Sequence, residues 1–378
     1  MKRLTVLALI AAACGRATPP ALPAPVAPPA PLPRAADARS YAALDTGAVR
    51  LNILLATTRR SVNSERPGDR YGPEDGDSLQ FAAVSVNVPS YRVRGTGDLP
   101  RPSALRDNPL AYRPDPQRDF FVASTISIDS ARFVQRLAAD LATTRSRDVL
   151  VFVHGYNVSF EDAAVRAAQV AADLNFDGSV ILFSWPSAAS VAAYVRDQQS
   201  ARNTGFQLLR LLRNHAVAAH PDRIHVLAHS MGAEVFGKAM TLAAPGDSTP
   251  RLAEVVLAAP DVDARVFKRE ILPRLSPHAA RITMYASTDD DALRASRLVN
   301  GAGRLGLGGD SLVVIDGMDT IDASRVTADV LGHTLFGNQG FLADLAVLLA
   351  NGTSPAERRL LPSRKDGLTF YRFRGDRR

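Results

Sequence analysis

Short apolar runs alternate with longer amphipathic stretches along most of this chain of 378 residues. Runs that are bounded by Gly, Pro and Asp are typical of buried strands, whereas apolar residues that recur every three or four positions indicate helices. On this basis we predict strands at residues 51–57, 81–88, 120–128, 149–153, 180–183, 224–228, 255–258, 282–285 and 312–315.

The intervals between these strands carry helical spacing. We predict helices at residues 129–143, 160–173, 188–218, 231–243, 264–275, 292–299 and 341–349. Strands that alternate with helices favour a mostly parallel central sheet with helices on both faces, joined by right-handed crossovers. The sequence therefore predicts a fold of the α/β class.

The start of the chain differs in composition from the rest. Lys2 and Arg3 precede an apolar run at residues 4–13, which leads through small residues into Cys14. This order is typical of a signal peptide, and Cys14 stands where a bacterial lipobox carries the cysteine that is lipidated. Ala11 occupies the position where a lipobox usually has Leu, so a plain signal peptide is the alternative.

A segment rich in Pro and Ala follows, and this composition favours an extended tether over a folded core. We expect a signal peptide with a lipobox at residues 1–14, a tether at 15–37 and a globular domain at 38–378. The expected location is the bacterial cell envelope, with a lipid anchor on the periplasmic or outer-membrane side if Cys14 is modified. Without that modification we expect a periplasmic or secreted protein.

Charge and cysteine content exclude several other classes. The net charge is +7, but the arginines are dispersed among nearly as many acids, so nucleic-acid binding is not indicated. The single cysteine rules out an intramolecular disulfide and a cysteine-based zinc site, and no histidine or carboxylate cluster suggests another metal. No later apolar run reaches the roughly 18 residues of a transmembrane helix.

The segment I-H-V-L-A-H-S-M-G at residues 224–232 has the pattern of a nucleophile elbow. A serine in a sharp strand-to-helix turn exposes its hydroxyl, and small neighbours let the strand and the helix approach closely. Ser230 is the predicted nucleophile, with Ala228 and Gly232 as the small neighbours. A serine before a helix is otherwise a common N-cap, so the motif needs support from its context.

That support comes from V-L-V-F-V-H-G-Y-N at residues 149–157, a strand that ends in His-Gly. In α/β hydrolases this is the usual place of the second oxyanion-hole donor. We predict that the backbone N–H groups of Tyr156 and Met231 stabilise the oxyanion. Two motifs in this order, each closing a strand, predict a serine hydrolase with residues 38–147 as N-terminal strands and loops and residues 148–350 as the catalytic core.

Four further motifs carry a resemblance to a known family: F-S-W-P at residues 183–186, A-A-P-D-V-D at 258–263, M-Y-A-S-T-D-D-D-A-L at 284–293 and L-G-H at 331–333. Together with the two segments above, they resemble a bacterial α/β-hydrolase family catalogued as a domain of unknown function. The similarity covers the strands from residue 51 onward and excludes the signal and the tether. It implies the α/β-hydrolase fold, with a mostly parallel central sheet and helices on both faces.

The order serine, acid, histidine in this fold requires a late histidine, and only His278 and His333 follow Ser230. His333 matches the family's late Gly-His and is the predicted general base. The family position of the acid corresponds to Asp290, with Asp289 and Asp291 as neighbours that alternatively cap a helix. Asp261 is the rival acid, since some lipases carry the acid one strand earlier.

These residues predict an enzyme that cleaves a small-molecule or lipid acyl ester through an acyl-enzyme, without metal or cofactor. An amidase or acyltransferase would use the same triad. A binding protein of the cell envelope on a catalytically idle scaffold is the alternative outside enzymes. The long Gly-, Pro- and Asp-rich segment at residues 65–116 is a candidate lid over the site.

Overall fold

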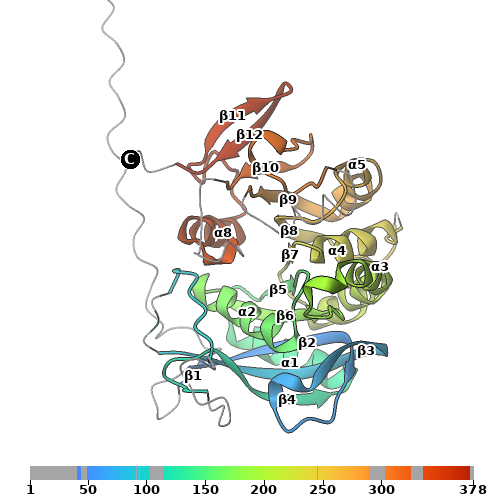
Figure 1. The fold of residues 1–378 in the computed structure, drawn as a ribbon, viewed down its shortest axis with the longest axis vertical. Helices are drawn as coiled ribbons and strands as arrows, with labels where there is room; N and C mark the ends of the chain where they lie inside the picture. Colours follow the sequence, from blue (N-terminus) through green and yellow to red (C-terminus); the bar gives the residue numbers. More distant parts are fainter. Residues whose placement is uncertain are drawn as a thin grey trace, which may run out of the picture. The chain divides into compact units, whose positions relative to one another are not determined.

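The computed structural model describes residues 41–43, 49–90, 92, 94–102, 114–244, 246–288, 303–324 and 335–374. Within these ranges the strands form one sheet in the order β11-β12-β10-β9-β8-β7-β5-β6-β2-β3-β4, and β1 pairs with β2 (Figure 1). Their bounds are β1 Tyr41–Ala43, β2 Val49–Ser61, β3 Tyr71–Val88, β4 Phe121–Ile128, β5 Asp148–Val153, β6 Gly178–Ser184, β7 Arg223–His229, β8 Leu252–Ala258, β9 Ala279–Ala286, β10 Asp319–Asp322, β11 Leu361–Lys365 and β12 Leu368–Arg372.

Parallel pairing runs through the sheet from β2 to β12, by way of β6, β5, β7, β8, β9 and β10. The two margins are antiparallel, formed by β1, β2, β3 and β4 on one side and by β11 with β12 on the other. Strands β5 and β6 are buried along their whole length, as parallel strands covered on both faces must be.

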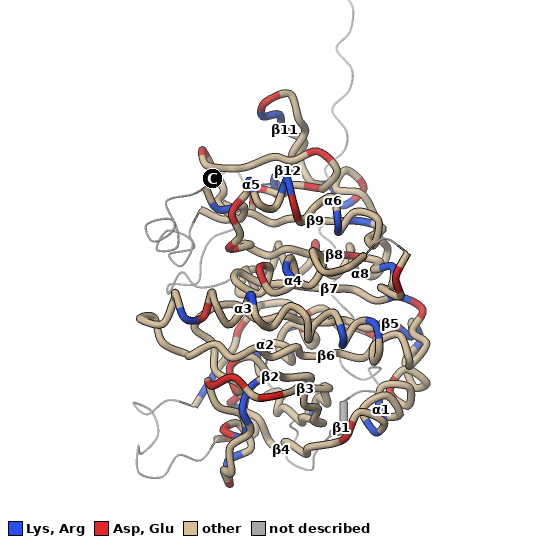
Figure 2. Tube along the Cα trace, turned by 90° about the vertical axis from the view of Figure 1, so that its right-hand side faces the viewer, with Lys and Arg blue, Asp and Glu red and all other residues tan. Residues whose placement is uncertain are grey.

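The helices are α1 Ser130–Thr143, α2 Phe160–Asp173, α3 Tyr194–Leu211, α4 Gly232–Thr241, α5 Ala264–Val266, α6 Leu272–Leu275 and α8 Gln339–Asn351. They divide between two hydrophobic cores, one on each face of the sheet. Helices α1, α3, α4 and α6 contribute to the first core, and α2 and α8 to the second (Figures 1 and 2). The predicted α/β-hydrolase architecture, a mostly parallel sheet covered on both faces, is confirmed.

Most of the predicted elements occur within a few residues of their expected bounds. Helix α2 coincides with the prediction, and Asp129, predicted as helical, is the N-cap of α1, where its side chain accepts from the Arg132 N–H. The helix predicted from residue 188 begins only at Tyr194. The reason is that the Asp197 carboxylate accepts from the Ala188 N–H at 2.9 Å, which holds the preceding residues in a turn. The helix predicted at residues 292–299 lies outside the described residues.

The strand predicted at residues 312–315 is wrong. Leu312 and Ile315 are buried in the first core, but the backbone between them joins no ladder. The strand of this region is β10, which pairs with β9 and β12. An apolar run indicates burial but does not show that the backbone pairs with a strand. This run is buried without such pairing, so the predicted strand was wrong.

Charged side chains of both signs are intermingled along the trace (Figure 2). At the amino ends of the parallel strands they form ion pairs between neighbours. Arg223 on β7 pairs with Asp148 on β5 at 2.5 Å, and Arg281 on β9 pairs with Asp319 on β10 at 2.7 Å. These pairs join adjacent strands across the edge opposite the predicted site.

A buried polar cluster links the carboxyl end of β9 to α8 and the segment after it. The Tyr285 hydroxyl donates to an Asp344 oxygen at 2.6 Å, and Arg358 pairs with the same carboxylate and donates to Tyr285 at 3.0 Å. All three residues are buried. Burial raises the pKa of Asp344, although Arg358 opposes the shift, so the carboxylate depends on this partner.

We predict that Asp344→Ala lowers the free energy of unfolding by about 3 kcal/mol, because it leaves a buried guanidinium without its carboxylate. Urea denaturation of the full chain measures the change. The matched control is Asp140→Ala, which removes a partly exposed i,i+4 pair with Arg136 and should cost less than about 1 kcal/mol. Equal losses in the two variants would contradict the structural role of the buried cluster.

Candidate active site

Ser230 occupies a sharp turn between the end of β7 and the start of α4. Its φ is +50°, a left-handed conformation that is uncommon outside glycine, and its side chain is almost buried. Two backbone hydrogen bonds hold the turn: the Ser230 N–H donates to the Ala258 carbonyl at 2.9 Å, and the Asp261 N–H donates to the Ser230 carbonyl at 3.0 Å. The end of β8 therefore fixes the strained turn.

Two glycines bring this turn against the loop after β5. A Cβ at Gly155 would lie 2.9 Å from the Ser230 Cβ, and a Cβ at Gly232 would lie 2.6 Å from the Val153 carbonyl oxygen. Both distances are too short for real atoms, so any larger residue would force the two segments apart. The His-Gly loop and the serine turn are thus in direct backbone contact.

This contact places both predicted oxyanion donors next to Ser230. Tyr156 follows Gly155 in the loop, and Met231 is the N-cap of α4, with a fully buried side chain. Within the described part of the chain neither amide donates a hydrogen bond to another residue. Free amides at a helix N-terminus favour an anion, which is the environment that an oxyanion requires.

The buried side chain of His154 holds the His-Gly loop in place. Its ring stacks on Trp185 with centroids 5.1 Å apart, its Nδ1 donates to the Gly155 carbonyl at 2.9 Å and its Nε2 accepts from the Trp185 N–H at 3.1 Å. Burial lowers the pKa of His154 to about 3, and likewise that of His229. Trp185 is fully buried, so it packs under the loop and presents no surface to a substrate.

Asp261, the rival acid, is held in a buried polar cluster. Its Oδ2 accepts from the Tyr194 hydroxyl at 2.7 Å, and its Oδ1 pairs with the Arg304 Nε at 2.9 Å. Arg304 also donates to the Tyr194 hydroxyl at 3.1 Å. Both carboxylate oxygens of Asp261 therefore have protein partners. Because the backbone N–H of Asp261 also donates to the Ser230 carbonyl, this residue stabilises the serine turn.

The remaining predicted residues, His333, Asp289, Asp290, Asp291 and Cys14, lie outside the described residues. The described strands that precede the first four in the chain, β9 and β10, have a known direction in the sheet. Asp290 follows the end of β9 and His333 follows the end of β10, and both strands run parallel to β7. The carboxyl ends of parallel strands meet at one edge, which is also the edge of Ser230.

A buried arginine that contacts the segment after β5 was not predicted from the sequence. Arg59, at the end of β2, donates to the Ser184 hydroxyl at 2.9 Å and to the carbonyls of Ser187 at 3.0 Å and Val158 at 2.7 Å. Burial lowers the pKa of this guanidinium to about 9. Arg59 thereby ties β2, the segment after β6 and the His-Gly loop together.

Most of the described part of the candidate lid is strand β3, which lies in the sheet between β2 and β4, and described residues after this strand contact α2. Arg101 pairs with Asp162 at 3.3 Å near the start of α2, and Arg92 pairs with Asp173 at its end, 2.5 Å away. Among the described residues, these stretches make no hydrogen bond or ion pair with Ser230. The described stretches therefore form a strand of the sheet and contact a helix of the second core.

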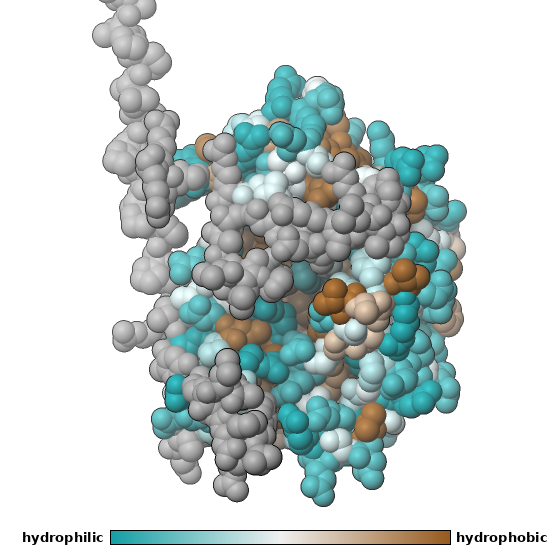
Figure 3. Space-filling model, in the orientation of Figure 1, coloured by the Kyte–Doolittle hydropathy of each residue, from teal (hydrophilic) through white to brown (hydrophobic). Residues whose placement is uncertain are grey.

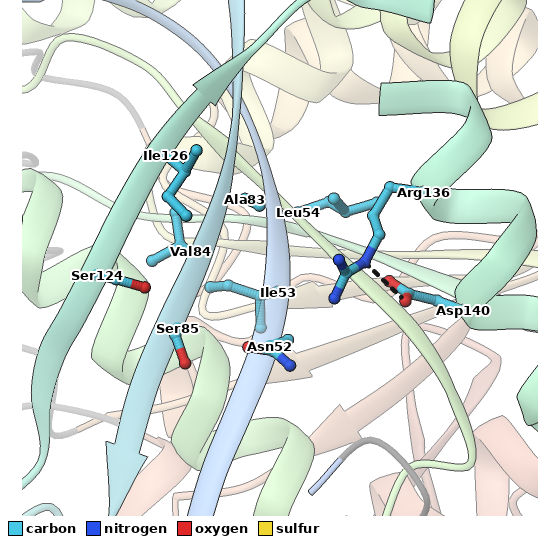
Figure 4. Close-up of a pocket in the computed structure, with 10 residues that line it drawn as sticks. All are labelled: Asn52, Ile53, Leu54, Ala83, Val84, Ser85, Ser124, Ile126, Arg136 and Asp140. Atoms are coloured by element: carbon cyan, nitrogen blue, oxygen red, sulfur yellow. Dashed lines mark hydrogen bonds and ion pairs between the residues drawn. The ribbon is translucent and has the colours of Figure 1, made fainter. Parts of the chain in front are cut away.

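Two cavities among the described residues are lined by neither Ser230 nor Tyr156. One of about 440 Å³ lies among α3, α4 and α5 and is lined by Arg202, Glu234, Lys238, Thr241, Leu242, Val262, Asp263, Val266, Glu270, Ile271 and Arg304. The other, of about 110 Å³, lies over β2, β3 and β4 beside the Arg136–Asp140 pair (Figure 4). Neither is lined by a residue that the sequence predicts for the site.

Among the described residues no group of His, Cys, Asp and Glu is placed to hold a metal ion. The same part of the chain contains no helix with the length and apolar character needed to cross a bilayer.

The sheet order and the serine turn define an α/β hydrolase. Residues 129–349 match the sequence profile of a family described as "Alpha/beta hydrolase of unknown function (DUF900)", and the match spans more than half of the chain. The protein belongs to this family of α/β hydrolases, which confirms the resemblance seen in the sequence. A comparison with curated proteins finds no match.

Two solved structures show distant likeness. One is of a protein described as a cell surface hydrolase from Lactobacillus plantarum WCFS1, with a TM-score of 0.32 and 11% identity over 57% of this chain and 96% of that one. The other is of a lipase-esterase related protein from Clostridium acetobutylicum ATCC 824, with a TM-score of 0.22 and 12% identity over 38% of this chain and 76% of that one.

We predict that the stability of the protein falls as the pH is lowered from 6.5 toward 3. Folded His154, with a pKa of about 3, stays almost wholly neutral until the pH nears that value, whereas the unfolded chain, with a histidine pKa near 6.5, takes up its proton well above it. Protonation therefore favours unfolding, by about 2 to 3 kcal/mol for this residue between pH 6.5 and 4.5.

Urea denaturation at several pH values measures this effect. His154→Asn should flatten the dependence by that amount, whatever constant penalty the lost contacts add, and the exposed His220→Asn serves as the matched control. An unchanged slope in His154→Asn would show that the ring is not held neutral in the folded protein.

Proposed function

We propose that this α/β hydrolase is a serine hydrolase that cleaves carboxylic esters, with Ser230 as nucleophile, His333 as general base and Asp290 as the acid. The observation that carries the proposal is the left-handed turn at Ser230 against the Gly155 loop, next to two backbone amides that donate to no other described residue. A serine that only caps a helix needs neither the strained φ nor the neighbouring loop.

In the proposed reaction, His333 takes the proton of the Ser230 hydroxyl while the oxygen attacks the acyl carbonyl. The amides of Tyr156 and Met231 stabilise the oxyanion, and Asp290 orients and stabilises the imidazolium. The imidazolium then protonates the leaving alcohol. Water, activated by the same histidine, attacks the acyl-enzyme and releases the acid, which returns Ser230 to its starting state.

An ester is preferred to an amide as the substrate because an alcohol leaves with less assistance than an amine. An amidase or acyltransferase would use the same residues and differ in the second nucleophile or leaving group. An idle scaffold with a binding role is the candidate outside enzymes. It would have no use for a strained serine beside free donors, since strain of this kind costs of order 1 to 3 kcal/mol.

We predict that the full chain forms one covalent adduct with a fluorophosphonate, measured by intact mass, and that Ser230→Ala and His333→Ala abolish it. Only an activated serine attacks phosphorus at a useful rate. Ser276→Ala, which removes a hydroxyl bonded to the Leu272 carbonyl, is the matched control and should label like the parent. A folded parent that forms no adduct would favour the binding scaffold.

Rates of hydrolysis of matched nitrophenyl esters and nitroanilides then distinguish an esterase from an amidase.

We further predict that Asp290→Asn lowers kcat by at least about a thousandfold with little loss of stability, because the histidine loses its orienting carboxylate. Asp261→Asn should instead destabilise the fold by about 3 kcal/mol, because it weakens the charge partner of buried Arg304. Ester hydrolysis and urea denaturation of both variants give the comparison. A large loss of kcat in stable Asp261→Asn would assign the acid to Asp261.

A further inference from the structure

The segment between β6 and α3 exposes hydrophobic side chains on the surface. Residues 188–195, here called the apolar tip, read A-A-S-V-A-A-Y-V and contain no charged side chain. Val191 and Val195 are 74% and 66% exposed. Figure 3 shows hydrophobic side chains gathered over the start of α3, on a face that is otherwise mostly hydrophilic. Exposed aliphatic surface of this kind is unfavourable in water unless something covers it.

The exposure is built into the fold. The Asp197 carboxylate accepts from the Ser187 hydroxyl at 2.6 Å and from the Ala188 N–H at 2.9 Å, which fixes the start of the tip. Tyr194 points inward and donates to Asp261 at 2.7 Å, which fixes its end. Buried carboxylates thus hold both ends of the tip, and Val191 and Val195 are exposed between and beside these contacts.

The tip is joined to the proposed oxyanion loop. The Tyr156 hydroxyl donates to the Ser190 carbonyl at 3.2 Å and also to the Val191 carbonyl. The Tyr156 and Tyr194 rings meet edge to face with centroids 5.2 Å apart. Tyr156 is adjacent to Gly155, which contacts Ser230, so an unbroken set of contacts leads from the nucleophile to the exposed valines.

We propose that the apolar tip binds the acyl chain of the substrate, and that the enzyme therefore prefers esters of medium-length aliphatic acids to acetate. This inference rests on the proposed function. A carbonyl held by the Tyr156 amide has its acyl chain attached at that point, and the tip is an exposed apolar surface in direct contact with Tyr156. Burying the valines against an alkyl chain removes apolar area from water on both sides.

The 440 Å³ cavity is the competing place for an alkyl chain, and its lining disfavours that role. Six of its eleven lining residues are charged: Arg202, Glu234, Lys238, Asp263, Glu270 and Arg304. An alkyl chain there would strip water from charges without replacing their hydrogen bonds. The tip carries no such penalty.

The test compares kcat/KM of the full chain for p-nitrophenyl octanoate and p-nitrophenyl acetate. The parent should favour octanoate by at least about tenfold, and the double variant Val191→Thr, Val195→Thr should reduce this ratio by about tenfold, since each buried methyl group is worth a factor of about three to four. Val347→Thr, the same change at a 41% exposed position of α8, is the matched control and should keep the parent ratio.

A parallel measurement uses alkyl fluorophosphonates, which report on the site without turnover. An octyl probe should label Ser230 faster than a methyl probe, and the double variant should lose that advantage. Efficient labelling and ester hydrolysis with a ratio that the double variant leaves unchanged would overturn the inference and leave the proposed function intact. Failure of the parent to label or to hydrolyse either ester would overturn both.

Loss of binding to phosphatidylglycerol vesicles in the double variant, with an unchanged octanoate to acetate ratio, would also overturn the inference. In that case the tip contacts a lipid surface and not the substrate.

Discussion

The close approach of two backbone segments is the constraint on which the candidate site depends. The serine turn and the His-Gly loop touch at Gly155 and Gly232, where even a methyl group would not fit. This contact brings the Ser230 turn against the loop that carries the Tyr156 amide, and it does so with backbone segments that follow the strands β5 and β7. Donors fixed in this way need no rearrangement when charge develops on a substrate, which is the source of most of their effect.

Buried polar groups hold this arrangement in place from below and from the side. Arg59 reaches from β2 to the carbonyls behind the loop, and Asp261 with Arg304 and Tyr194 braces the turn at Ser230. Such groups are costly to bury, and this cost is offset only when every hydrogen-bond and charge partner is present. These groups lie at the carboxyl edge of the sheet, where burying them costs stability but fixes the geometry of the candidate site.

The sequence allowed the fold class, the serine turn and the loop beside it to be predicted, because each depends on local patterns. Helix α2 follows from apolar spacing and a serine cap, and the turn from small residues around Ser230. The role of Arg59 had no local signal, since its partners lie far away along the chain. The strand expected at residues 312–315 failed for the opposite reason: its burial is real, but pairing is decided by distant strands. The hairpin of β11 and β12 was not predicted, although its Asp366-Gly367 turn is a local sequence signal for one.

The family match and the sheet have different limits, and this difference bears on how the protein can be divided. The match begins near α1 and ends in α8, yet β2 pairs with β6, and β12 pairs with β10, from outside it. A fragment cut at residues 129 and 349 would leave two parallel strands with open rows of N–H and carbonyl groups, the condition under which sheets recruit strands from other molecules. A fragment that keeps the sheet intact therefore extends to its outermost hydrogen-bonded strands, several of which lie beyond the region that matches the family.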